Sequence, residues 1–135
     1  MEWSKHFPIS CPPKDADAIA SITVYRFLKC NDAKIEPEHF LTVREVSPNH
    51  EKYEKEDIEC KACSLSVLTN NEDVLRLQKR VPRWRLPVAV GILDVTAGKI
   101  KYTPSKPMGN SHHSWWIPID IKPCEFFNQI IPPPS

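Results

Sequence analysis

Two stretches of the chain concentrate side chains that can do chemistry. Residues 60–63 read Cys-Lys-Ala-Cys, and residues 111–116 read Ser-His-His-Ser-Trp-Trp. Two thiolates separated by two residues can hold one tetrahedral Zn²⁺ from a single turn. Histidine is suited to proton transfer near neutral pH, and tryptophan can stack on a base or a sugar. We therefore expect any chemistry of this protein to gather around these two stretches.

The pair Cys60 and Cys63 supplies only half of a zinc site. His112, His113 or another cysteine brought near by the fold would have to complete it, and zinc is the one cofactor that the sequence suggests. The alternative is two small buried cysteines at the start of a strand. The chain has five cysteines and no visible signal peptide. An odd count argues against a disulfide framework and for free thiols in a reducing cytoplasm.

The two histidines cannot serve the same pocket. Adjacent residues of an extended chain point to opposite faces, so only one of His112 and His113 would meet a given partner. That histidine could act as a catalytic residue, with Arg26 holding an anion and Ser66 in support. Alternatively, both histidines bond to loops and the neighbouring tryptophans are anchors of the core.

A third group is basic and aromatic and spans residues 76–85. Its basic residues recur at a spacing of three and four, so they share one helical face up to the break at Pro82. Trp84 lies between two arginines, a pattern typical of nucleic-acid contacts. With the double tryptophan, the predicted partner-binding residues are Arg76, Arg80, Arg83, Trp84, Arg85, Trp115 and Trp116. The alternative is a solvated helix face.

Charge is distributed unevenly along the chain although the net charge is only +1. Residues 45–59 hold six acids and two lysines, whereas residues 76–106 hold eight bases and one acid. The basic segment could therefore meet an acidic partner, a phosphate or a nucleic acid. The alternative is two solvated faces that compensate each other.

The chemistry must be positioned by short elements, because the chain has 14 prolines and 3 glycines. Alternating and apolar runs predict strands over residues 21–29, 64–68, 87–95, 99–103 and 115–121. A capping box at 69–72 opens a helix over about 70–81, which Pro82 ends. Residues 123–131 predict a short C-terminal helix, and the polar residues 47–59 predict an exposed loop.

Together these elements predict an α+β fold, mainly an antiparallel sheet with one main helix and a short C-terminal helix. The length of 135 residues fits a single domain over residues 1–135. Residues 1–14 are an irregular lead-in and 132–135 a tail. No apolar run is long enough to span a bilayer, so we expect a cytoplasmic protein with no membrane contact. Standard P-loop, dinucleotide and HExxH motifs are missing from the sequence, which disfavours those enzyme classes.

Two resemblances add to this. Tyr25–Arg26 with Ser64–Leu65–Ser66 is similar to the first two signature elements of ADP-ribosyltransferases. The resemblance implies that Arg26 holds the phosphates of NAD and that a serine supports the nicotinamide site. The family's catalytic glutamate on a later strand has no match here.

The order VYRFLK, EHFLT, CKACSLSVLTNNEDV, VAVGIL and TPSKPMGNSHHSWWIP resembles a group of small uncharacterised bacterial proteins. It covers most of residues 22–127 and implies a chain complete in itself, without implying an activity. Two functions follow as hypotheses. The first is a bacterial accessory module that binds a protein or a nucleic acid. The alternative is a small ADP-ribosyltransferase-like or phosphoester-acting effector that uses His112 or His113 with Arg26.

Overall fold

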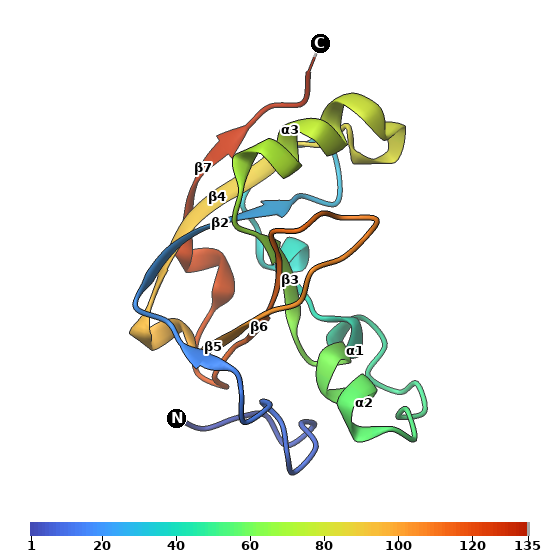
Figure 1. The fold of residues 1–135 in the computed structure, drawn as a ribbon, viewed down its shortest axis with the longest axis vertical. Helices are drawn as coiled ribbons and strands as arrows, with labels where there is room; N and C mark the ends of the chain where they lie inside the picture. The colour runs from blue at the N-terminus through green and yellow to red at the C-terminus, as the bar shows by residue number, and fades with distance from the viewer. Residues whose placement is uncertain (135) are drawn as a thin grey trace.

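The computed structural model describes residues 1–134, and Ser135, the last residue of the predicted tail, lies outside it. Seven strands form one sheet in the order β1-β5-β6-β3-β2-β4-β7, and every pairing is antiparallel (Figure 1). The strands are β1 (Asp17–Ala18), β2 (Ser21–Phe27), β3 (Leu65–Leu68), β4 (Val88–Asp94), β5 (Lys99–Tyr102), β6 (His112–Trp116) and β7 (Phe127–Ile131). The antiparallel sheet agrees with the predicted α+β class, but the prediction of one main helix is not confirmed, because residues 1–134 form three α-helices.

The central strand β2 is apolar on both faces, as its sequence predicts. It pairs with β4 along its whole length, from Ser21 opposite Asp94 to Phe27 opposite Val88. On one face Val24 belongs to the main core, and on the other Phe27 packs in a second cluster under α3. This two-residue alternation follows from the pleat of the strand.

The other neighbour of β2 is joined to it at a single pair. Strand β3 meets β2 only where Leu68 lies opposite Tyr25, and beyond that pair the two strands run in clearly different directions (Figure 1). The carbonyl of Ser66 therefore has no partner from the β2 backbone, and the side chain of Arg26 donates to it instead. The guanidinium thus takes the place of the backbone donor that a paired strand would have supplied.

Three α-helices accompany the sheet: α1 (Val43–Val46), α2 (Glu56–Ala62) and α3 (Asn71–Arg80). Helix α3 is the longest and matches the predicted helix, but its N-cap is Asn70 rather than Thr69. The Asn70 side chain accepts from the N–H of Glu72, and Thr69 instead donates to the carbonyl of Ser111. The predicted loop over residues 47–59 is partly wrong, because α2 begins within it.

The predicted C-terminal helix is present only over its first four residues. A 3-10 helix, η4 (Pro123–Phe126), is followed by strand β7, which pairs with β4. The free edge of β4 offers a row of unpaired backbone groups, and pairing them outweighs the local helical spacing. Further 3-10 turns are η1 (Pro37–Phe40), η2 (Pro82–Trp84) and η3 (Val95–Ala97).

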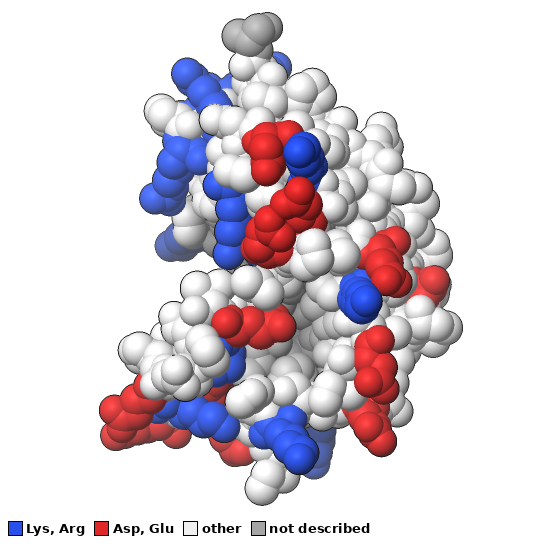
Figure 2. All heavy atoms as spheres, turned by 180° about the vertical axis from the view of Figure 1, so that it is seen from behind, with Lys and Arg blue, Asp and Glu red and all other residues white. Residues whose placement is uncertain are grey.

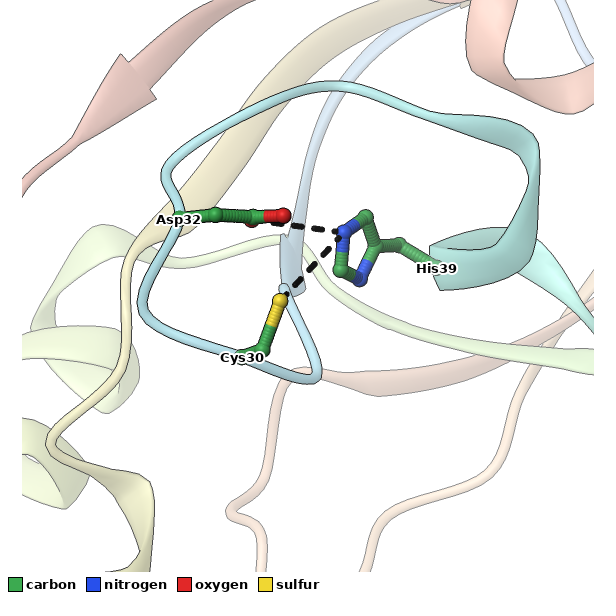
Figure 3. A group of neighbouring side chains, drawn as sticks. All are labelled: Cys30, Asp32 and His39. Atoms are coloured by element: carbon green, nitrogen blue, oxygen red, sulfur yellow. Dashed lines mark hydrogen bonds and ion pairs between the residues drawn. The ribbon is translucent and has the colours of Figure 1, made fainter.

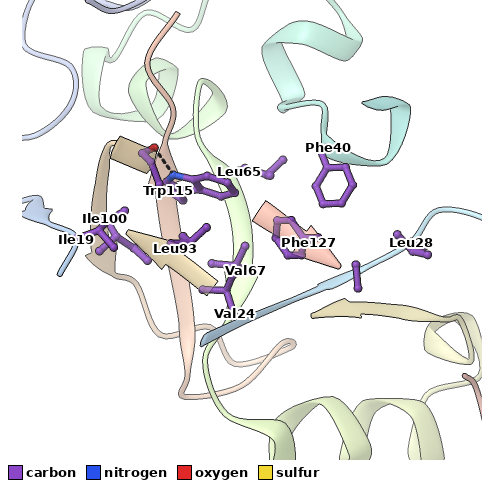
Figure 4. Packing of buried hydrophobic residues seen from close by; sticks show 12 residues of the cluster. Ile19, Val24, Leu28, Phe40, Leu65, Val67, Leu93, Ile100, Trp115 and Phe127 are labelled. Carbon is purple, nitrogen blue, oxygen red and sulfur yellow. Dashed lines mark hydrogen bonds between the residues drawn. The ribbon is translucent and has the colours of Figure 1, made fainter. Parts of the chain in front are cut away.

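The main core lies on one face of the sheet and is centred on Trp115 (Figure 4). Trp115 is fully buried, and its indole Nε1–H donates to the carbonyl of Ala97 at 2.8 Å. Phe127 and Phe40 pack beside it with ring centroids 4.7 Å apart. A buried indole that is both packed and hydrogen-bonded is a structural anchor.

Candidate binding pocket

One pocket brings together three of the four predicted catalytic residues. Arg26, Ser66 and His112 all line a hollow of about 440 Å³ that lies between the end of β2, β3 and η2. This volume lies within the range of about 300–1,000 Å³ that is typical of small-molecule ligand pockets. The residues come from β2, β3 and β6, and it is the divergence of β2 from β3 that opens the space between them.

Arg26 is held in place by carbonyl oxygens and not by a carboxylate. Its Nε donates to the carbonyl of His39 at 3.1 Å, and its Nη1 donates to the carbonyl of Ser66 at 2.9 Å. Among residues 1–134 no acid lies within ion-pair distance of it. The guanidinium is thus oriented by the fold while its charge stays uncompensated.

Burial shifts the titration of this cation and of its neighbour. It lowers the pKa of Arg26 to about 10, so the guanidinium remains charged at neutral pH. Burial also lowers the pKa of Lys29, and the nearby charge of Arg26 acts in the same direction. Two cations at one end of the pocket make this end attractive to an anion.

His112 presents a lone pair to the pocket. Its Nδ1 lies 2.8 Å from the carbonyl oxygen of Thr103, which can only accept, so Nδ1 carries the proton. Nε2 is then an acceptor, and it has no partner among residues 1–134. Every fully buried side-chain nitrogen or oxygen in that range has one, so Nε2 must be open to the space outside. Burial lowers the pKa of His112, which keeps the ring neutral at pH 7.

An aromatic wall completes the pocket. Trp84 from η2 packs against Phe27 of β2 with ring centroids 4.9 Å apart. The guanidinium carbon of Arg83 lies 5.7 Å from the centroid of the Trp84 ring. None of the lining residues is an aspartate or a glutamate. The pocket therefore combines a cation, a neutral acceptor and an aromatic surface, the set that fits a planar anionic ligand.

The remaining residues of the predicted catalytic stretch lie elsewhere. His113 faces away from this pocket and packs on Tyr102, with its Nδ1 against the carbonyl of Ser111. The prediction that Trp115 and Trp116 contact a partner is wrong, since both are buried. Trp116 donates to the carbonyl of Cys60 at 2.9 Å. Bulky apolar side chains on an inner strand of a sheet are usually buried in the core.

The basic residues divide into two groups. The side chain of Arg76 has partners within the protein. Its Nη2 donates to the carbonyl of Met108 at 3.2 Å and lies 3.7 Å from Oδ1 of Asp73. The others are exposed and have no acid within ion-pair distance in residues 1–134. We call them the basic edge: Lys79, Arg80, Arg83 and Arg85. Figure 2 shows Lys and Arg gathered at its upper left, where Figure 1 viewed from behind has the end of α3, above a hollow in the surface.

The predicted zinc pair is not a pair of thiolates. Cys60 forms a disulfide with Cys11, so the expectation of free thiols throughout is also wrong. Cys63 is a buried thiol whose pKa is raised to about 11 by burial and by the neighbouring carboxylate of Glu59. The disulfide therefore removes Cys60 as a thiolate ligand in this structure, and Cys63 is the one thiol left of the predicted pair.

A second cluster that the sequence did not predict lies beside the pocket (Figure 3). Ligand atoms of Cys30, Asp32 and His39 lie within 4.8 Å of one another. However, Nδ1 of His39 accepts the N–H of Lys29 at 3.0 Å, so the neutral ring carries its proton on Nε2. That proton points to Asp32 at 3.7 Å and Cys30 at 4.0 Å, which leaves no lone pair for a metal. The cluster fixes the loop that supports Arg26.

No family model, curated protein or solved structure was found to match this chain. Within residues 1–134, none of the helices has the length and apolar character needed to cross a membrane. The pocket and the basic edge are therefore interpreted from their own chemistry.

Proposed function

We propose that this protein is a binding module for single-stranded nucleic acid. The observation that carries the proposal is the position of Trp84. This ring lines the pocket and at the same time contacts Arg83 of the basic edge. An aromatic surface next to unpaired cations is the arrangement with which proteins stack bases and neutralise phosphates.

The binding mode follows from these contacts. A base would stack on Trp84, because every base has a π-face that an indole can cover. The exposed guanidinium of Arg83 would move from the ring to a phosphate. Lys79, Arg80 and Arg85 would contact further phosphates along the edge, since no carboxylate competes for them in residues 1–134.

The test is fluorescence anisotropy with a labelled single-stranded RNA of about 12 nucleotides, the matching DNA and a duplex of the same sequence. Trp84→Ala should raise the Kd about tenfold by removing a stacked base. Arg80→Ala with Arg83→Ala should reduce the slope of log Kd against log salt by about 0.7 for each phosphate that is no longer neutralised.

The matched control is Lys5→Ala with Lys122→Ala, which removes two exposed charges outside the basic edge. It should leave both the Kd and the salt slope close to those of the wild type. The proposal fails if no oligonucleotide binds at low salt, a result that would favour an acidic protein as the partner. It also fails if the control weakens binding as much as the two arginine substitutions do.

A second candidate is a phosphoester-acting enzyme, favoured by the convergence of Arg26, Ser66 and His112 on one pocket. His112 Nε2 would take the proton of an attacking hydroxyl as its oxygen bonds to phosphorus, and would return it to the leaving oxygen. Arg26 would stabilise the charge on the phosphoryl oxygens. An ADP-ribosyltransferase-like reaction is less well supported, because no carboxylate lines the pocket. Turnover of a chromogenic phosphodiester that His112→Gln abolishes would support this candidate, and its complete absence would remove it.

A further inference from the structure

Arg26 differs from the cations of the basic edge in one respect: it is half-buried within the pocket, whereas they are exposed on the surface. Its Nε and Nη1 are used by the carbonyls of His39 and Ser66, but Nη2 has no partner among residues 1–134. Since no fully buried side-chain nitrogen in that range lacks a partner, Nη2 keeps some exposure, and Arg26 lines the pocket. The fold thus aims a pair of N–H donors and a positive charge at the hollow.

Resting on the proposed function, we infer that this pocket binds a phosphomonoester and so recognises the terminal phosphate of the bound strand. A phosphomonoester has a charge of about −1.5 to −2 and three acceptor oxygens, more than a phosphodiester within the chain. Guanidinium groups bind such oxygens through paired, charge-assisted hydrogen bonds.

The position of Arg26 favours a phosphate at the end of the strand over one within it. Internal phosphates can follow the exposed basic edge, but a guanidinium set between β2 and β3 is reached by a group that projects from the chain. Trp84 borders the same hollow, so the terminal base can stack while its phosphate reaches Arg26. The volume of about 440 Å³ is on the scale of one such ligand rather than of several nucleotides.

Two further side chains complete the site. Ser66 is exposed, and its hydroxyl has no hydrogen-bond partner among residues 1–134, so it can donate to a phosphate oxygen beside Arg26. His112 Nε2 is an acceptor and can take the hydrogen of a ribose hydroxyl or of a base. Lys29 adds a second cation at the rim. None of these side chains carries a negative charge that would repel an anion.

The experiment compares oligonucleotides of one sequence with a 5′-phosphate, a 3′-phosphate or hydroxyls at both ends, labelled internally. One of the two phosphorylated strands should bind about tenfold more tightly than the hydroxyl-ended strand. Calorimetry with a nucleoside monophosphate, the nucleoside and inorganic phosphate identifies which part of the ligand the pocket binds. The monophosphate should bind, and the nucleoside should not. Weak binding of inorganic phosphate alone would show that the anion is the main determinant.

Arg26 substitutions could disturb the β2–β3 junction, so the test variant is Ser66→Asp. This change places a carboxylate beside the guanidinium without removing a buried contact. It should abolish the preference for a phosphorylated end, because the new carboxylate repels the phosphate and pairs with the guanidinium. Ser21→Asp, at an exposed position of β2 outside the pocket, should keep the preference.

Two outcomes would overturn the inference: equal affinity for all three strands, or a preference that survives Ser66→Asp. These are distinct from failure of the proposed function. If no strand of any kind binds while the nucleoside monophosphate does, the nucleic-acid proposal falls and the phosphomonoester pocket remains.

Discussion

At the scale of single residues, the fold determines which partners surround a charged side chain. Arg26 stands on a largely apolar strand, and such a residue needs polar partners. The partners of Arg26 in the structure are the carbonyl oxygens of His39 and Ser66. Unlike a carboxylate, these oxygens do not neutralise its charge. Likewise Thr103 determines the tautomer of His112. A cation and an acceptor that are oriented but unused are what a binding pocket requires.

His112 should make stability depend on pH. Burial lowers its pKa in the folded protein below the value of 6.5, with Lys61, His113 and Arg26 contributing, whereas Thr103 opposes the shift. The unfolded chain then binds more protons below about pH 6.5. The free energy of unfolding is therefore largest above this pH and falls as the pH drops through 6.5 towards the folded pKa.

Urea unfolding at about pH 7.5 and about pH 5.5 measures this dependence. His112→Gln should reduce the loss of stability between the two pH values, because the group that is harder to protonate in the folded state is gone. His113→Gln, on the same strand but outside the pocket, is the matched control and should keep the loss. Equal pH dependence in wild type and His112→Gln would contradict the assignment.

At the scale of elements, a buried ion pair connects α1 to α2. Arg44 donates from Nη2 and Nε to the two carboxylate oxygens of Glu59 at 2.6 and 2.8 Å. Arg44 also donates to the carbonyls of Ser47 and His50, and Glu59 accepts the N–H of Tyr53. The polar segment 47–59, which the sequence predicts as an exposed loop, is therefore held by hydrogen bonds at both of its ends.

Glu59→Gln should destabilise this part of the molecule strongly. The amide keeps the shape of the side chain but leaves the charge of Arg44 uncompensated in a buried place. Thermal unfolding followed by circular dichroism should show a Tm lower by about 10 °C. Glu56→Gln, exposed in the first turn of the same helix, should shift the Tm by a small fraction of that. A Glu59→Gln protein as stable as the Glu56→Gln control would refute the role of the pair.

At the scale of the whole molecule, the Cys11–Cys60 disulfide connects the irregular N-terminal segment to α2. Ala16 and Trp116 are buried with it, and Trp3 and Phe7 pack on this small cluster. The lead-in residues form no helix or strand up to Asp17, so packing and one covalent bond are what hold them. The segment is therefore part of the domain and not a loose extension.

Cys11→Ser should lower the free energy of unfolding under oxidising conditions by about 4 kcal/mol, the value for a loop of this length in the chain-entropy model. Adding a reductant should destabilise the wild type by a similar amount and have no further effect on the variant. Cys30→Ser, an exposed free thiol, serves as the control and should keep the response to reductant. Five reactive thiols in the denatured, unreduced protein would show that the disulfide is absent.

Local pattern predicted a good part of the fold. The helix over about 70–81 and the strands around β2, β3, β4 and β5 follow from periodicity and from Pro82, which act over a few residues. The same local rules failed at residues 127–131, where the open edge of β4 imposes a strand. They also placed the start of β6 too late, since pairing with β3 begins at His112.

The sequence by itself therefore determined which segments alternate between apolar and polar residues, where the main helix ends, and where charged and aromatic side chains are concentrated. Only the tertiary structure decided that Arg26, Ser66 and His112 share a pocket, that Trp115 and Trp116 are core, and that Cys60 bonds to Cys11. The physical reason is the range over which each effect acts. Propensity and amphipathic spacing act between near neighbours, whereas contacts such as Arg26–Ser66 and Cys11–Cys60, 40 and 49 residues apart, depend on how all surfaces are buried together.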